Sequence, residues 1–272
     1  MKRALGCLLL LAGCAATPEA SGPGVALSSD PHVPPFANGP YEPFSRAAVV
    51  AIALREWRLF GSPVDDDPPG TRPEPAPEDK PEREQGLWQR VGEYWWLGMP
   101  PGSPESAWTG KHDGRGAEFA AKVDGRYAWS AAFVSYVMRI AGAANRFPYA
   151  ADHADYINAA AQGPGQGWLI TAERPESYAP RPGDLICVGR GKSAKLRFDD
   201  LPAPRFPSHC DIVVATAPGQ LSVIGGNVDD AVTMKHVPTT PEGMIATADG
   251  TAVDTRYPWF VVLRVQDSNV TS

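Results

Sequence analysis

The sequence has few cysteines and no cysteine motif that holds a metal. Four of its 272 residues are cysteine, and none stands in a C-x-x-C pair or at a spacing typical of a zinc site. We therefore expect no metal ion and no cofactor. Cys187 and Cys210 lie in expected strands, where they either pair in a disulfide or lie apart as small buried side chains.

Basic clusters and the serine motif of lipases are also missing. No Lys/Arg cluster follows the N-terminus and the formal net charge is −6, which argues against nucleic-acid binding. No G-x-S-x-G motif is present, which argues against a lipase or esterase. The acidic residues within 62–85 are separated by prolines and make a poor cation cage. We expect this segment to be a surface loop or linker without a site.

The first residues resemble a bacterial lipoprotein signal. Lys2 and Arg3 precede an apolar run over 5–11 that is too short to span a bilayer, and Leu-Ala-Gly-Cys at 11–14 resembles the lipobox. The resemblance implies cleavage before Cys14, lipidation of its thiol and, because Ala15 follows, the periplasmic face of the outer membrane. The alternative is a plain secretory signal with an incidental cysteine. We expect a signal peptide over 1–13 and a membrane anchor at Cys14.

Composition divides the rest of the chain into four parts. Residues 14–43 are rich in Ala, Ser, Gly and Pro and are expected to form a flexible tether. Residues 44–86 hold a helix over 44–61, capped by Ser45, and the Pro-rich acidic loop. Residues 87–266 form the main domain and residues 267–272 a tail.

Helical patterns come first in the main domain and strand patterns follow. The expected helices cover 87–97, 128–142 and 151–162, and the expected strands cover 185–188, 209–217, 221–224, 231–237 and 259–265. Because too few strands alternate with helices for a parallel doubly wound sheet, we expect an α+β fold. Its N-terminal helices would pack on a small antiparallel sheet of about five strands.

Residues 128–142 predict the helix around which the domain is organised. Apolar residues recur at three- and four-residue steps, at Phe133, Val134, Val137, Met138 and Ala141. Ser130 stands near the start of this helix. It is either an N-cap, which contributes about 1 kcal/mol, or a nucleophile to which the fold brings a histidine from elsewhere.

Four segments taken together resemble the papain-like NlpC/P60 and CHAP cell-wall hydrolases. They are Trp-Ser-Ala-Ala-Phe-Val at 129–134, Pro-Gly-Asp at 182–184, His-Cys-Asp-Ile-Val-Val at 209–214 and Gly-Gly-Asn at 225–227. The closer similarity is to the bacterial DUF2272 family within that superfamily, in which serine stands at the cysteine position and Phe-Pro-Tyr at 147–149 is followed by His153. The resemblance covers residues 88–265 and implies a papain-like, NlpC/P60-type domain.

This resemblance implies roles for individual residues. Ser130 takes the nucleophile position, His209 that of the general base, and Asn227 that of the residue that orients the histidine. Asp211, on the same face of the expected strand as His209, could supply a carboxylate instead. The residues expected to contact substrate are Trp129, Tyr149 and His153, with a solvated surface position as the alternative for His153.

Serine at the nucleophile position is a departure from most of the superfamily. A cysteine can be pre-ionised by a helix terminus and a histidine, whereas a serine must lose its proton during attack. Three roles for Ser130 therefore remain open. It is an active nucleophile, a helix cap in an enzyme that has lost its activity, or a hydroxyl that binds substrate. We expect a lipid-anchored envelope protein that hydrolyses an amide bond of peptidoglycan or its stem peptides. The alternative is an inactive lipoprotein that binds peptidoglycan or acts as a scaffold.

Overall fold

The computed structural model describes residues 43–73 and 75–267. The expected signal peptide over 1–13, Cys14 and almost all of the expected tether lie outside the described residues. Within the described ranges, no helix has the length and apolarity that crossing a membrane requires.

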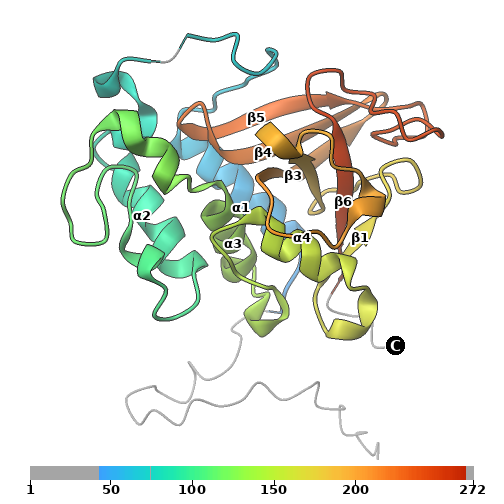
Figure 1. Ribbon diagram of the computed structural model, residues 1–272, viewed down its shortest axis with the longest axis horizontal. Helices are drawn as coiled ribbons and strands as arrows, with labels where there is room; N and C mark the ends of the chain where they lie inside the picture. Colours follow the sequence, from blue (N-terminus) through green and yellow to red (C-terminus); the bar gives the residue numbers. More distant parts are fainter. Residues whose placement is uncertain (1–42, 74, 268–272) are drawn as a thin grey trace, which may run out of the picture. The chain divides into compact units, whose positions relative to one another are not determined.

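The described ranges contain four α-helices joined by short 3-10 turns. They are α1 (Arg46–Leu59), α2 (Leu87–Gly98), α3 (Ser130–Ile140) and α4 (His153–Ala161). The expected cap of the first helix is confirmed, because the Ser45 hydroxyl accepts a hydrogen bond from the Ala48 N–H at 3.1 Å. All four helices lie to the left of or below the sheet in Figure 1, and α3 contacts both α1 and α2.

The strands form one open antiparallel sheet in the order β1-β6-β2-β3-β4-β5. Their bounds are Ile170–Glu173 for β1, Leu185–Gly189 for β2, Ser208–Ala217 for β3, Gln220–Val228 for β4, Ala231–Pro238 for β5 and Trp259–Val265 for β6. The α+β class and the antiparallel sheet are therefore confirmed. The strand that the sequence did not predict is β1, whose four residues are too few to show a period and which pairs with β6.

The expected end of β4 at Ile224 is wrong, because the strand continues through Gly225 and Gly226 to Val228. Glycine normally weakens a strand. Here it lets α3 lie close to the sheet, since a Cβ at Gly226 would be 2.5 Å from the Phe133 Cβ. The register of β4 with β5 shifts between Gly226 and Val228.

Both faces of the sheet are buried. The face toward the helices includes Cys210, Ile212 and Ile224, and these side chains share one hydrophobic cluster with α1, α2, α3 and α4. The opposite face forms a second, smaller cluster that includes Val213, Val223, Ile245 and Trp259. The side chains alternate between the two clusters as the two-residue period of a strand requires.

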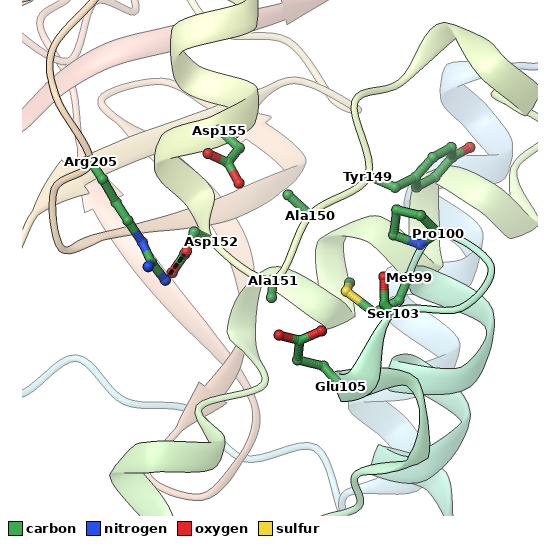
Figure 2. A pocket seen from close by; sticks show the side chains of 10 residues that line it. All are labelled: Met99, Pro100, Ser103, Glu105, Tyr149, Ala150, Ala151, Asp152, Asp155 and Arg205. Atoms are coloured by element: carbon green, nitrogen blue, oxygen red, sulfur yellow. Dashed lines mark ion pairs between the residues drawn. The ribbon is translucent and has the colours of Figure 1, made fainter. Parts of the chain in front are cut away.

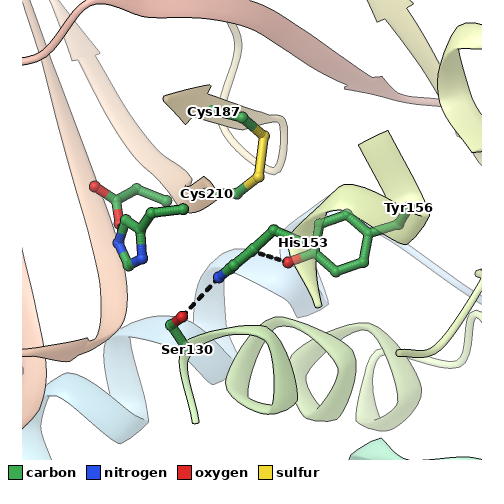
Figure 3. Close-up of a disulfide and its surroundings, with 7 residues drawn as sticks. Ser130, His153, Tyr156, Cys187 and Cys210 are labelled. Atoms are coloured by element: carbon green, nitrogen blue, oxygen red, sulfur yellow. Dashed lines mark hydrogen bonds and ion pairs between the residues drawn. A yellow bond between two sulfur atoms is a disulfide. The ribbon is translucent and has the colours of Figure 1, made fainter. Parts of the chain in front are cut away.

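A disulfide joins Cys187 and Cys210, which settles the alternative left open by the sequence. The two residues lie directly opposite each other on β2 and β3, with an Sγ–Sγ distance of 2.06 Å. The bond lies in the helix-facing cluster, next to the start of α4 (Figure 3). It therefore fixes β3 to β2 immediately beside His209.

Residues 62–85, which were expected to form a surface loop or linker without a site, make buried contacts with the rest of the domain. Val64 bridges Met234 of β5, and Lys80 and Glu82 are 5% and 2% exposed. Prolines at the first positions of two short 3-10 turns, Pro77–Asp79 and Pro81–Arg83, direct the chain back across the domain. This segment therefore brings Glu82 to the start of α3.

Candidate active site

Ser130 is the first residue of α3 and does not cap it. The N-cap position is held by Trp129, which makes no side-chain capping bond. The Ser130 Oγ instead lies 2.7 Å from Nε2 of His153, the first residue of α4. Of the readings offered by the sequence, the N-cap is therefore wrong. A buried hydroxyl–imidazole contact stands in its place (Figure 3).

His153 is held on its other side by Tyr156, three residues later on α4. The Tyr156 hydroxyl contacts Nδ1 of the ring, as residues at this spacing on a helix can. His153 is 4% exposed, so the solvated position considered for it is wrong. Burial lowers the pKa of His153 well below its ordinary value, and the nearby His209 lowers it further. The ring is therefore neutral at neutral pH.

The proton positions follow from the burial of Tyr156. Within the described ranges, His153 Nδ1 is the acceptor available to the Tyr156 hydroxyl, which would otherwise be a buried donor without a partner. If the phenol donates to Nδ1, the proton of the neutral ring is on Nε2 and points at the Ser130 Oγ. The Ser130 hydroxyl then accepts from His153, and its own proton is available to a second acceptor.

His209 lies on β3 and is held by a carboxylate of the same strand. Its Nε2 is 2.7 Å from Oδ1 of Asp211, and Oδ2 of Asp211 is 2.7 Å from Nζ of Lys235 on β5. The three residues are between 0% and 1% exposed. Nδ1 of His209 is buried and has no hydrogen-bond partner among the residues that the structure describes. Asp211 thus has the contact that was expected of an orienting residue.

Glycine on β4 makes this same-strand contact possible. A Cβ at Gly225 would lie 2.0 Å from Oδ1 of Asp211 and 2.9 Å from Nε2 of His209. Any larger residue at this position would occupy the space in which the carboxylate and the ring meet.

The charges in this part of the site are balanced. Burial alone would raise the pKa of Asp211, but Lys235 and His209 lower it well below its ordinary value. Burial and the Arg190 guanidinium lower the pKa of His209 to about 4, although Asp211 acts in the opposite direction. At neutral pH, Asp211 is therefore a carboxylate and His209 a neutral ring.

Ser130 and His209 are near each other but not hydrogen-bonded. The ring centroids of His153 and His209 are 5.3 Å apart, which places both imidazoles at the start of α3. In the described part of the chain, the hydrogen-bond partner of the Ser130 Oγ is His153. The expected Ser130–His209 contact is therefore replaced by a Ser130–His153 contact, and His209 packs against the His153 ring.

Among the described residues, the Asn227 side chain forms its hydrogen bonds with residues other than His209. Its Oδ1 accepts from the Trp129 N–H at 3.3 Å and its Nδ2 donates to Oε2 of Glu82 at 3.3 Å. The Asn227 backbone has a φ of 55°, a left-handed conformation that asparagine tolerates better than most residues. Asn227 thus holds the start of α3, and the orienting contact expected of it is made by Asp211.

Glu82 is a buried residue that the sequence analysis missed. It accepts from the Trp129 indole N–H as well as from Asn227. Burial raises its pKa to about 8, and the charges of Asp230 and Asp124 add to that rise. These three carboxylates converge, but Lys80 already lies 3.2 Å from Asp124 and 3.0 Å from Asp230. No local pattern in a proline-rich segment could have identified Glu82.

The two aromatic residues that were expected to contact substrate differ in position. Trp129 is 1% exposed and packs between Phe60 and Tyr94, so it is a core residue. Tyr149 lies under the Arg139 guanidinium and borders a pocket of about 450 Å³ (Figure 2).

The pocket lies between the segment after α2 and the start of α4. Its charged lining residues are Glu105, Asp152, Asp155 and Arg205, and Arg205 is ion-paired with Asp152. Asp152 directly precedes His153, but Ser130, His153 and His209 do not line the pocket.

The comparisons with known proteins identify one family. The model of DUF2272, described as an uncharacterized protein conserved in bacteria, matches residues 82–265. No curated protein and no solved structure matches the sequence. The matched range covers more than half of the chain and includes Ser130, His153, His209 and Asp211. The chain belongs to the DUF2272 family.

Proposed function

We propose that this protein is a serine-dependent amide hydrolase that acts on the peptide part of bacterial peptidoglycan. The observation that carries the proposal is the position of Ser130, whose hydroxyl lies at the N-terminus of an α-helix, 2.7 Å from one buried imidazole and near a second. The free N–H groups and the dipole at a helix N-terminus stabilise negative charge that develops on an attacked carbonyl oxygen.

The two histidines would have different tasks in this reaction. His209 Nδ1 is the open acceptor, so it takes the Ser130 proton when Oγ attacks the carbonyl carbon. This step requires the hydroxyl to rotate from His153 toward His209. Asp211 stabilises the imidazolium, which then gives its proton to the leaving amine. His209 then takes a proton from the water that attacks the acyl-enzyme carbonyl, and it returns that proton to the Ser130 oxygen as the acyl group leaves.

His153 supports this scheme as a hydrogen-bond donor. With Tyr156 donating to Nδ1, its Nε2–H is directed at the Ser130 Oγ and holds the hydroxyl until it turns. The competing arrangement makes His153 the base. It requires Ser130 to donate to Nε2 and leaves the Tyr156 proton without an acceptor in the described part of the chain.

The substrate and the location rest on resemblance. A helix that starts with the nucleophile and an antiparallel strand that carries the histidine match the order of the papain-like NlpC/P60 and CHAP hydrolases. We extend the proposal to that fold and to peptidoglycan stem peptides as substrate. The lipobox-like residues 11–14 support an anchor at Cys14 on the periplasmic face of the outer membrane.

A digest of purified sacculi tests the proposal. Wild-type protein should release muropeptides, and Ser130→Ala should lower the rate by a factor of roughly 10⁴ or more. Ser135→Ala, at a buried serine five residues further along α3, is the matched control and should keep the activity. Equal product profiles for the wild type and Ser130→Ala would remove the catalytic claim.

One observation favours a second candidate function, that of a non-catalytic peptidoglycan-binding protein. Ser130, His153 and His209 are 7%, 4% and 1% exposed, so a substrate carbonyl reaches them only if the surrounding residues move. Co-sedimentation with sacculi separates the two candidates. A wild-type protein that sediments with sacculi and releases no soluble fragment is a binding protein.

A further inference from the structure

Lys235 reaches the site from two strands away. The strand order places β4 between β3 and β5, yet Nζ of Lys235 lies 2.7 Å from Oδ2 of Asp211. The contact passes over β4 at Gly225, where the space of a side chain is filled by the Asp211 carboxylate. Lys235 is 1% exposed, and its Nζ lies 5.4 Å from the centre of the Tyr257 ring.

We propose that Lys235 is a positioning residue, which holds Asp211 so that the carboxylate keeps His209 in the tautomer with a proton on Nε2 and an open acceptor at Nδ1. The importance of this for catalysis rests on the proposed function. The tautomer of His209 and the role of Lys235 in fixing it do not depend on whether the protein is a hydrolase.

The geometry explains why both oxygens of Asp211 are needed. A carboxylate only accepts hydrogen bonds, so Oδ1 of Asp211 receives the His209 Nε2–H while Oδ2 receives the Lys235 ammonium. With one oxygen held from β5, the carboxylate cannot turn away from the ring. A neutral imidazole with a proton on Nε2 carries its lone pair on Nδ1, the atom that lacks a partner in the described ranges.

The second effect of Lys235 is on charge. The groups that face His209 are Asp211 on its own strand, His153 on α4, Arg190 after β2 and Lys235 on β5, while Gly225 on β4 contributes none. Lys235 offsets the negative charge of Asp211. Without it, less of that charge is offset, which favours the imidazolium, in which Nδ1 is protonated and no longer an acceptor.

Nitrogen NMR of the labelled full chain tests this without any substrate. In the wild type near pH 6, His209 should show a protonated, pyrrole-like Nε2 and an unprotonated, pyridine-like Nδ1. In Lys235→Met, its pKa should rise by roughly 1–3 units, because a buried carboxylate next to it has lost its counter-charge. Lys235→Arg should restore the wild-type spectrum. A His209→Gln spectrum assigns the ring among the five histidines of the chain.

Two further variants keep the test decisive. Lys195→Met removes an exposed lysine and should leave the His209 resonances unchanged. Asp211→Asn replaces Lys235→Met as the test variant if Lys235→Met does not fold. Its amide oxygen should turn to Lys235 and its NH₂ group to His209 Nε2, so that the proton of the ring moves to Nδ1. An unchanged tautomer and pKa in the Lys235 and Asp211 variants that fold would overturn the proposal.

The sacculus digest then separates this proposal from the proposed function. If the wild type is active, Lys235→Met should lower kcat and raise the pH of the acidic limb of the rate profile, and Lys235→Arg should recover both. If the wild type is inactive while the NMR result holds, the positioning role stands and the hydrolase proposal fails.

Discussion

The rings of His153 and His209 have centroids 5.3 Å apart, yet they have very different neighbours. Ser130, His153 and Tyr156, which we term the helix half of the site, contain hydroxyl groups and one neutral ring and carry no formal charge at neutral pH. His209, Asp211 and Lys235, the sheet half, place an ammonium, a carboxylate and a ring in a row with 2.7 Å contacts.

The difference shows what each half can contribute. Neutral hydrogen bonds contribute about 1 kcal/mol each, so the helix half can rearrange at small cost. Breaking a buried ion pair costs several times more, so the sheet half is rigid. In the proposed reaction the Ser130 hydroxyl must turn, and it lies in the helix half. The base His209 must keep its orientation, and it lies in the sheet half.

The largest expected effect comes from breaking the sheet half at Asp211. Asp211→Ala leaves the Lys235 ammonium buried without a counter-charge and should lower the free energy of unfolding by roughly 3–5 kcal/mol. Urea denaturation measures it. Glu242→Ala, which removes an exposed carboxylate, should stay within about 0.5 kcal/mol of the wild type. If both variants lose the same amount, the sheet half is not held by its charges.

A smaller loss of stability should appear as the pH falls, and its direction is set by the lowered pKa values of the buried histidines. The pKa of His209 is about 4 in the folded protein against an ordinary value of 6.5, so the unfolded chain binds the proton more readily. The free energy of unfolding should therefore fall between pH 6.5 and pH 4, by about 3 kcal/mol from this ring. The lowered pKa of Asp211 removes stability only at a lower pH.

Urea denaturation at several pH values measures this dependence. His209→Gln should make the curve less steep between pH 6.5 and pH 4, while the lowered pKa of His153 keeps its own contribution. His112→Gln, which leaves both buried rings in place, is the control. An unchanged slope in His209→Gln would show that this ring is not the source of the acid sensitivity.

The smallest expected effect comes from the helix half. Tyr156→Phe removes the hydroxyl that contacts Nδ1 of His153 and should cost about 1 kcal/mol in the same assay. Tyr127→Phe, a half-buried tyrosine outside the site, should change stability less. A loss as large as that of Asp211→Ala would mean that the two halves do not differ in the way we describe.

Local patterns predicted most of the elements. The three-to-four-residue steps between Phe133 and Ala141 placed α3 within two residues of its observed bounds, and alternation over residues 209–217 placed β3 within one. β1 was missed because a four-residue strand is too short to show a period. The continuation of β4 was missed because its glycines are accommodated by Phe133 and Asp211, which lie elsewhere in the chain.

The candidate site was predicted less completely than the fold. The family resemblance pointed to Ser130 and His209, and strand alternation added Asp211, but His153 was expected to contact substrate and Asn227 to orient the histidine. Lys235 and Glu82 carry no local signal, since a lysine in a strand and a glutamate in a proline-rich segment are normally exposed.

The sequence alone determined that a hydroxyl stands at the start of one helix and that a histidine and an aspartate share one face of a later strand, because helix and strand periods are local properties. Tertiary structure decided that His153 contacts Ser130 and that Lys235 reaches Asp211 over Gly225. These contacts depend on the position of α4 and on the order β3-β4-β5, which are set by the packing of distant segments.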